Sequence, residues 1–302
     1  MAISEFHYEN INSRSDLIAS LRDALITNLN WVESASTTSK TTEMLIKSPD
    51  EISTGKNLIA HLHTYAGTGD SFALHIYRPD DDAFTGSNSF DNPDADPPSC
   101  FGHSVRDLSD NSGSDSNRQY WKTIDEMYPA YLDVYGDTKG FMLVFRPMQS
   151  DSDKTWGIAY AWGYSPLIES QDYPVAYFCA RATDLFGGTN SYGFYLSHRN
   201  GDSTVKNNNN YRRIAFKIYS YFLEGGGDTS SISGVNITKW VYPFVCYRTT
   251  ASLREIVTYP NLKVGTYDLN FGDIIDVNGT QYKVVWRRSN ISSDGSLLIK
   301  IN

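Results

Sequence analysis

Residues 273–286 read DIIDVNGTQYKVVW and contain the strongest local signal in the chain. The Asn278-Gly279 dipeptide stands between two runs of residues that favour strands. Both residues accept the positive φ angles of a type I′ turn, whose twist matches that of the flanking strands. We therefore expect a tight hairpin here. A further strand over 297–301 should follow the turn residues Ser293-Asp294-Gly295.

Similar strand-forming runs recur along the chain. They are expected at 44–46, 58–62, 72–77, 131–135, 141–146, 156–162, 175–182 and, more weakly, 192–197. Residues 211–223 fit either a helix or a strand. These runs predict a mainly β (α+β) fold, with antiparallel sheets, one N-terminal helix and a small C-terminal β domain.

The helix is predicted over about residues 14–30. Ser13 or Ser15 can cap its N-terminus, where Asp16 also suits the helix dipole. One face is apolar at helical spacing and consists of Leu17, Ile18, Leu21, Leu25 and Leu29. Trp31 is expected to fold back onto the core that this face meets.

The predicted organisation has two parts. Residues 1–224 form a main α+β body that carries a long polar loop at 78–119. A Gly/Ser linker follows at 225–234, and 235–302 form a small C-terminal β domain. A unit of that size is near the lower limit for independent folding, so we expect it to lean on the main body or on a neighbouring subunit.

Composition excludes several classes of function. The net charge of −9 opposes binding to phosphates, so no direct contact with nucleic acid is expected. The three cysteines have neither disulfide nor metal-ligand spacing, and Cys179 and Cys246 are expected to be small buried hydrophobic residues. The N-terminus does not have the pattern of a signal peptide, and no apolar run is long enough for a membrane span. We expect a soluble protein made in a cytoplasm.

The sequence offers residues for two kinds of metal site. His61, His63 and His75 lie on two predicted neighbouring strands, so three imidazoles on one sheet face would suit zinc; partly exposed strand residues are the simpler interpretation. The acidic segments 80–82 and 91–96 offer oxygen ligands for calcium, and 110–117 looks loosely like a calcium loop. However, the twelfth position from Asp110 is Trp121 instead of Glu, which favours solvated loop charge.

A glycosidase would use two carboxylates across a cleft, with aromatic platforms such as those at Trp156, Trp162 and Tyr164. Acids such as Glu169 are plentiful, but the sequence selects no pair. It contains no nucleophile elbow, phosphate loop or dinucleotide fingerprint. The prediction is a protein that is not an enzyme, with no catalytic residues, no cofactor and no metal.

Three segments resemble virion structural proteins of tailed bacteriophages, of the neck, tail or baseplate kind. They are the polar leader and helix at 15–25 with Trp31, the block 140–146 with 156–160, and the terminal hairpin 272–285. The resemblance implies a non-enzymatic building block of the virion, assembled in the host cytoplasm. Its partners would be other virion proteins and copies of itself in a ring. The polar loop at 78–119 departs from the compact pattern.

Two alternatives stay open. The first is a β module that binds a glycan or a host receptor, motivated by aromatic residues expected to be exposed between Tyr160 and Tyr164. The second is a carboxylate-dependent glycoside hydrolase.

Overall fold

The described part of the chain folds into three antiparallel β-sheets and one helix. The computed structural model describes residues 2–65, 71–77, 90–91, 120–122, 127–148, 156–163, 175–181, 194–196, 241–249, 254–266, 269–287 and 295–302. Every strand pairing in these ranges is antiparallel. The predicted mainly β class is therefore confirmed.

The central sheet has six strands, in the order β1 (Ser4–Ile11), β7 (Ala130–Asp137), β8 (Gly140–Pro147), β9 (Gly157–Gly163), β10 (Val175–Arg181) and β11 (Phe194–Leu196). The N-terminal sheet has the order β2 (Val32–Glu33), β3 (Glu43–Ser53), β4 (Lys56–Tyr65), β5 (Ser71–Tyr77) and β6 (Tyr120–Lys122). The C-terminal sheet has the order β12 (Val241–Thr249), β13 (Arg254–Thr266), β16 (Gly295–Lys300), β15 (Thr280–Arg287) and β14 (Ile274–Val277).

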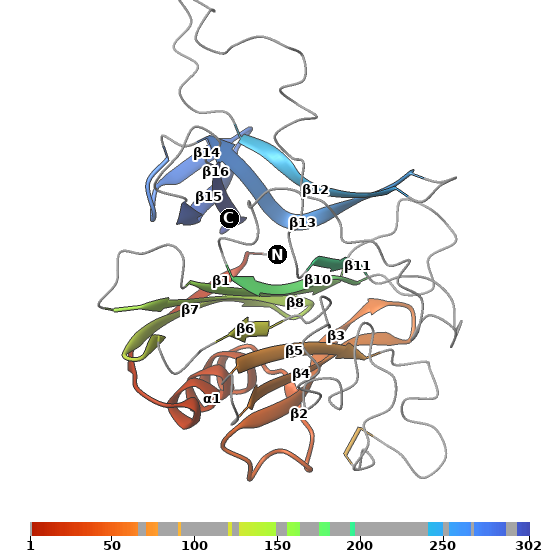
Figure 1. Cartoon of the computed structure of the whole chain (residues 1–302). Coiled ribbons are helices and arrows are strands. Elements are labelled where there is room, and N and C mark those ends of the chain that lie inside the picture. The colour runs from red at the N-terminus through yellow and green to blue at the C-terminus, as the bar shows by residue number, and fades with distance from the viewer. Residues whose placement is uncertain are drawn as a thin grey trace, which may run out of the picture.

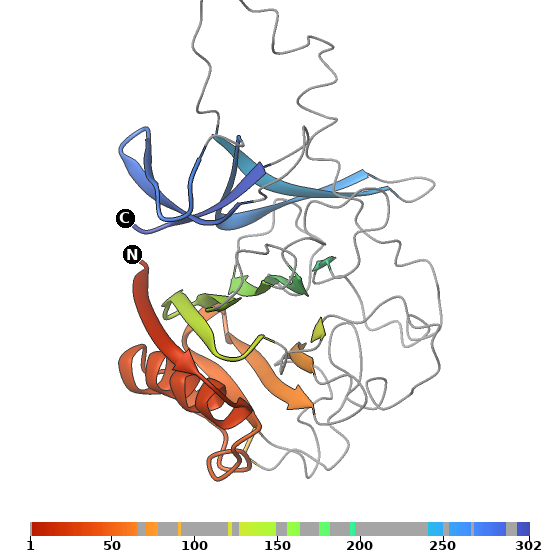
Figure 2. The same cartoon turned by 60° about the vertical axis from the view of Figure 1, so that its left-hand side comes forward.

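The sheets stack as layers, as Figures 1 and 2 show from two sides. The C-terminal sheet, in blue, covers one face of the central sheet. The N-terminal sheet, in orange, lies on the other side of the central sheet together with the helix. The central sheet is therefore covered on both faces.

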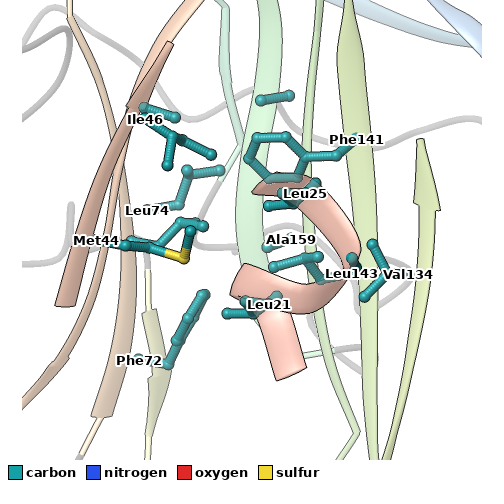
Figure 3. Close-up of a cluster of buried hydrophobic side chains, with 14 of the residues drawn as sticks. Leu21, Leu25, Met44, Ile46, Phe72, Leu74, Val134, Phe141, Leu143 and Ala159 are labelled. Carbon is teal, nitrogen blue, oxygen red and sulfur yellow. The ribbon is translucent and has the colours of Figure 1, made fainter. Parts of the chain in front are cut away.

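The helix fills the space between the N-terminal and central sheets. It consists of α1 (Arg14–Arg22), followed by a π-helical turn, η1 (Asp23–Asn28). Ser13 is the cap, since its Oγ accepts a hydrogen bond from the Asp16 N–H at 3.1 Å. Figure 3 shows Leu21 and Leu25 between the two sheets. The predicted helix, its apolar face and the return of Trp31 to the same cluster are confirmed.

A second cluster joins the C-terminal sheet to the central one. It is built from buried side chains of both sheets, including Tyr160, Trp162 and Phe178 from the central sheet and Tyr259 and Trp286 from the C-terminal sheet. The Tyr160 hydroxyl donates a hydrogen bond to the Pro260 carbonyl across this junction. The C-terminal strands thus lean on the main body, one of the two placements expected for them.

The predicted hairpin is present. Val277 pairs with Thr280, and the two residues between them, Asn278 and Gly279, have φ angles of 54° and 80°. Asp276 Oδ1 accepts a hydrogen bond from the Gly279 N–H at 2.8 Å. The turn chemistry seen in the sequence therefore fixes the register of β14 on β15.

Some predictions need correction, and others concern segments outside the described residues. The polar leader is a strand, β1, whose polar side chains face outward along one margin of the central sheet. The strand predicted at 44–46 extends over all of β3. Cys179 is buried, as predicted. The segments at 211–223 and 225–234 lie outside the described residues, and so does most of the 78–119 loop. Within the described part of the chain, no helix has the length and apolar character needed to cross a membrane.

The hydrogen bond from Tyr160 to Pro260 gives a first prediction. Tyr160→Phe leaves a partly buried carbonyl without its donor, so the free energy of unfolding should fall by about 1–2 kcal/mol. The matched control is Tyr282→Phe, on the other face of the C-terminal sheet, where a change within about 0.5 kcal/mol is expected. Denaturant unfolding measures both. Equal losses in the two variants would contradict the assigned role of Tyr160.

Candidate functional site

A group of polar and aromatic side chains lies at the margin of the junction between the central and C-terminal sheets. We call it the rim cluster. Its members are His7 on β1, Tyr131 and Asp133 on β7, Arg146 on β8, Trp156 before β9, and Phe271 in the turn before β14.

Strand register brings the polar members together. His7 pairs with Asp133, and Tyr131 pairs with Arg146. Directly opposed residues of an antiparallel pair share one face of the sheet, so two separate strand pairings converge on the same spot. Phe271 arrives from the C-terminal sheet by a turn that needs the positive φ of Gly272, 86°.

The charge of the cluster centres on the buried Asp133 carboxylate. Its Oδ1 lies 2.5 Å from His7 Nδ1, and its Oδ2 accepts a long hydrogen bond from Arg146 Nε at 3.4 Å. Partial burial alone would lower the pKa of His7, but the hydrogen bond and the charge of Asp133 outweigh it and raise that pKa. His7 Nε2 lies 3.2 Å from Glu9. Carboxylates therefore engage both ring nitrogens, which is the arrangement of a cross-linking ion pair and not of a general base that faces a nucleophile.

Aromatic rings surround the Arg146 guanidinium. Its Cζ atom lies 4.0 Å from the ring centre of Tyr131, 4.9 Å from that of Phe271 and 5.9 Å from that of Trp156. The rings of Trp156 and Phe271 meet edge to face at 5.4 Å. Rings that contact the faces of a guanidinium leave its N–H groups, which lie in the plane, free for acceptors.

Those N–H groups are only partly used. Among the described residues, Asp133 is the one hydrogen-bond acceptor of Arg146, and it takes Nε. The Arg146 side chain is 18% exposed to solvent. A guanidinium in this condition can bind an oxyanion in bidentate fashion through its two terminal nitrogens.

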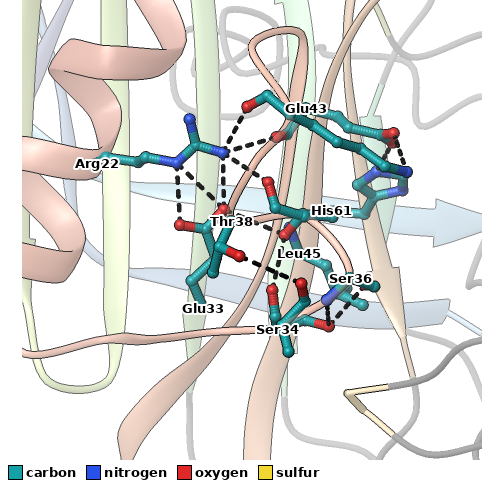
Figure 4. Close-up of polar contacts among 11 residues, drawn as sticks. Arg22, Glu33, Ser34, Ser36, Thr38, Glu43, Leu45 and His61 are labelled. Carbon is teal, nitrogen blue, oxygen red and sulfur yellow. Dashed lines mark hydrogen bonds and ion pairs between the residues drawn. The ribbon is translucent and has the colours of Figure 1, made fainter.

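A second polar group, shown in Figure 4, holds the N-terminal sheet to the helix. Arg22 donates from Nε and Nη2 to the Glu33 carboxylate at 2.8–3.1 Å. Nη2 also donates to the backbone carbonyls of Thr37, Lys40 and Glu43. This arginine has a paired charge and several backbone acceptors, so its role is to tie the 34–42 connection to α1.

The histidines considered as metal ligands lie beside this group. Glu43 Oε2 is 2.6 Å from His61 Nε2 and 3.7 Å from His63 Nε2. His75 pairs with His61 in the strand register, but its side chain lies outside the described part. Within the described residues, no three His, Cys, Asp or Glu side chains form a metal-binding group. The contacts instead support an ion pair: the hydrogen bond from His61 lowers the pKa of Glu43 to about 2.

The aromatic residues expected to be exposed are buried. Tyr160 and Trp162 face the C-terminal sheet, so the feature that motivated a glycan-binding module is absent at these two positions. Tyr164 and Glu169 lie outside the described residues, as do the acidic segments except for Asp91. Asp91 accepts a hydrogen bond from the Ala35 N–H at 3.3 Å.

The sequence reading missed the rim cluster. Its one available signal was a charged residue inside each of two apolar runs, Asp133 and Arg146. A buried charge needs a partner, so two charges of opposite sign in predicted neighbouring strands indicate a pair.

No protein-family model matches the chain, and a search of curated proteins finds no match.

The Arg22 contacts give a second prediction. Arg22→Lys keeps the charge but loses the planar fork that serves a carboxylate and several carbonyls at once. The free energy of unfolding should fall by about 2 kcal/mol. The control is Lys40→Met, which removes an ion pair to Glu43 whose lysine is 48% exposed; its expected effect is below about 1 kcal/mol. The prediction fails if Arg22→Lys matches the wild type.

His63 gives a third prediction, on pH. Burial, with a contribution from the nearby His61, lowers the pKa of His63 from 6.5 to about 4. Between these values the unfolded chain takes up a proton that the folded chain refuses, so this contribution to stability is complete above pH 6.5 and is lost as the pH falls toward 4. His63→Gln should flatten the decline in the free energy of unfolding over that range.

His7→Gln serves as the opposite control for the His63 experiment. The pKa of His7 is raised, so its contribution is present at low pH and disappears as the pH rises through the folded value. Denaturant unfolding at stepped pH separates the two signs. Identical pH profiles for wild type and His63→Gln would refute the assignment.

Proposed function

We propose that this chain is a structural subunit of a tailed-phage virion, of the neck, tail or baseplate type. It works through contacts with other virion proteins and with copies of itself in a ring. The proposal joins the resemblance of the helix, the central block and the terminal hairpin to one observation on the surface of the C-terminal sheet.

That observation is an exposed apolar edge. Phe271 and Ile274 are 40% and 57% exposed, and they are two of the three large hydrophobic side chains that are exposed in the described part of the chain. Ile274 begins β14, the outermost strand of the C-terminal sheet. An outer strand with apolar side chains favours contact with another chain, both through its backbone and through its surface.

The pairing of buried carboxylates with cations inside the subunit supports the same function. The rim cluster and the Arg22 group commit their buried carboxylates to arginine or histidine partners, Asp133 to Arg146 and His7, and Glu33 to Arg22. Paired buried carboxylates stabilise a rigid body, whereas a hydrolase keeps at least one carboxylate available for proton transfer. A rigid stack of sheets suits a subunit that transmits load in a particle.

Assembly state gives the fourth prediction. The chain has a mass of 33.9 kDa. Mass photometry of the purified protein should show oligomers, with masses of two or more times that value. Mass spectrometry of purified particles should find it in several copies. Ile274→Ser should shift the distribution toward monomer. Val32→Ser is the matched control, because Val32 is 45% exposed but lies on the edge strand of the N-terminal sheet. A persistent wild-type monomer that is missing from particles would overturn the proposal.

A further inference from the structure

We infer that the rim cluster is a docking site for a carboxylate on an acidic and apolar segment of a partner protein, with Arg146 as the anchor. The inference rests on the proposed function, since it assigns a chemistry to the protein contact that the function requires.

The first step is the state of the Arg146 guanidinium. Asp133 takes Nε through a long hydrogen bond, and the rings of Tyr131 and Phe271 lie against the group. Among the described residues, the two terminal nitrogens have no acceptor. A planar fork flanked by rings is already held in place, so it loses little side-chain entropy when it binds a carboxylate.

The second step is the local charge. Asp133 would repel an incoming anion, but it is buried, and His7 and Arg146 engage its two oxygens. Glu9 is exposed and lies against the far nitrogen of His7. The charges of Asp133 and Arg146 cancel, and the Asp133 contact favours the protonated form of His7, whose charge offsets that of Glu9.

The third step selects a protein partner. Ile274 pairs with Lys283, so the two share a face of the C-terminal sheet, and Lys283 forms an ion pair with Glu5 on β1. The exposed Ile274 thus lies toward the same strand that carries His7, on the same rim as Phe271. A carboxylate that reaches Arg146 would find the exposed ring of Phe271 beside it, and Ile274 lies three residues further along the same exposed segment. A protein segment with an acidic residue between apolar residues matches this pattern, whereas a sugar gains little from an aliphatic contact.

The test uses the full chain and an acetylated, amidated Leu-Glu-Leu peptide, with Leu-Gln-Leu as the matched neutral peptide. Nitrogen-15 NMR of the arginine Nε–H groups reports binding, and the Arg146 signal is assigned by its loss in Arg146→Lys. We expect the acidic peptide to shift that signal in a saturable way and the neutral peptide to shift it at least tenfold less at equal concentration. A third arm uses glucuronate, a carboxylate carried by a sugar.

Variants test whether Arg146 itself binds the carboxylate of the peptide. Arg146→Gln should abolish the peptide-dependent shifts of neighbouring backbone amides, and Phe271→Ser should weaken binding several-fold. The control Lys47→Gln removes another cation that lies over a ring, that of Phe90 on the N-terminal sheet, and should bind as the wild type does. A cooperative unfolding transition and a wild-type pattern of distant backbone amide signals in each variant show that the fold is intact, also where loss of the Asp133 partner lowers the free energy of unfolding.

Three outcomes would overturn the inference: equal shifts with both peptides, binding that survives in Arg146→Gln, or tighter binding of glucuronate than of Leu-Glu-Leu. These outcomes are distinguishable from failure of the proposed function. A chain that binds the acidic peptide but is absent from particles keeps the site and loses the virion role. A chain found in particles that ignores the peptide keeps the role and loses the site.

Discussion

Burial of the central sheet on both faces is the constraint on which the rest of the structure depends. In β8, Phe141, Leu143 and Phe145 belong to the cluster with the helix, while Met142 and Val144 belong to the cluster with the C-terminal sheet. A strand covered on both sides must be apolar on both sides, because an unpaired charge there is costly. The helix and both outer sheets are consequently attached to one continuous apolar slab, and charge is confined to its margins.

This constraint explains which parts of the fold were predictable. Strands β7 to β10 are largely apolar on both faces and, apart from Asp133 in β7, appear in the sequence as apolar runs, so their existence was evident although the order of the layers was not. The turn at Asn278-Gly279 was predictable because its chemistry is local. Strand β1 was not, since only one of its sides meets the core and its polar residues hide the alternation. Its place beside β7 depends on a pairing across more than a hundred residues.

The same reasoning applies to the rim cluster. Its members come from four separate stretches of chain, and no spacing within any one stretch relates His7 to Arg146 or either of them to Phe271. What the sequence did contain was the anomaly of Asp133, a carboxylate in a run that is otherwise apolar. The histidines on β4 illustrate the reverse case: His61 and His63 share a face as expected, but the Glu43 carboxylate on the adjacent strand pairs with His61, and burial lowers the pKa of His63 to about 4.

The two arginines with buried carboxylate partners separate structure from function. Arg22 has a bidentate carboxylate at 2.8–3.1 Å through Nε and Nη2, and Nη2 also donates to backbone carbonyls, so these two nitrogens serve the fold. Among the described residues Arg146 has one acceptor, at 3.4 Å from Nε, and the ring of Tyr131 lies 4.0 Å from its Cζ atom. An acceptor within the protein that bonded to the two terminal nitrogens would add stability, and the fold forgoes this contribution. A site of that kind is understandable when the missing acceptor belongs to another molecule, and the exposed Phe271 beside Arg146 supplies an apolar contact that such a partner needs.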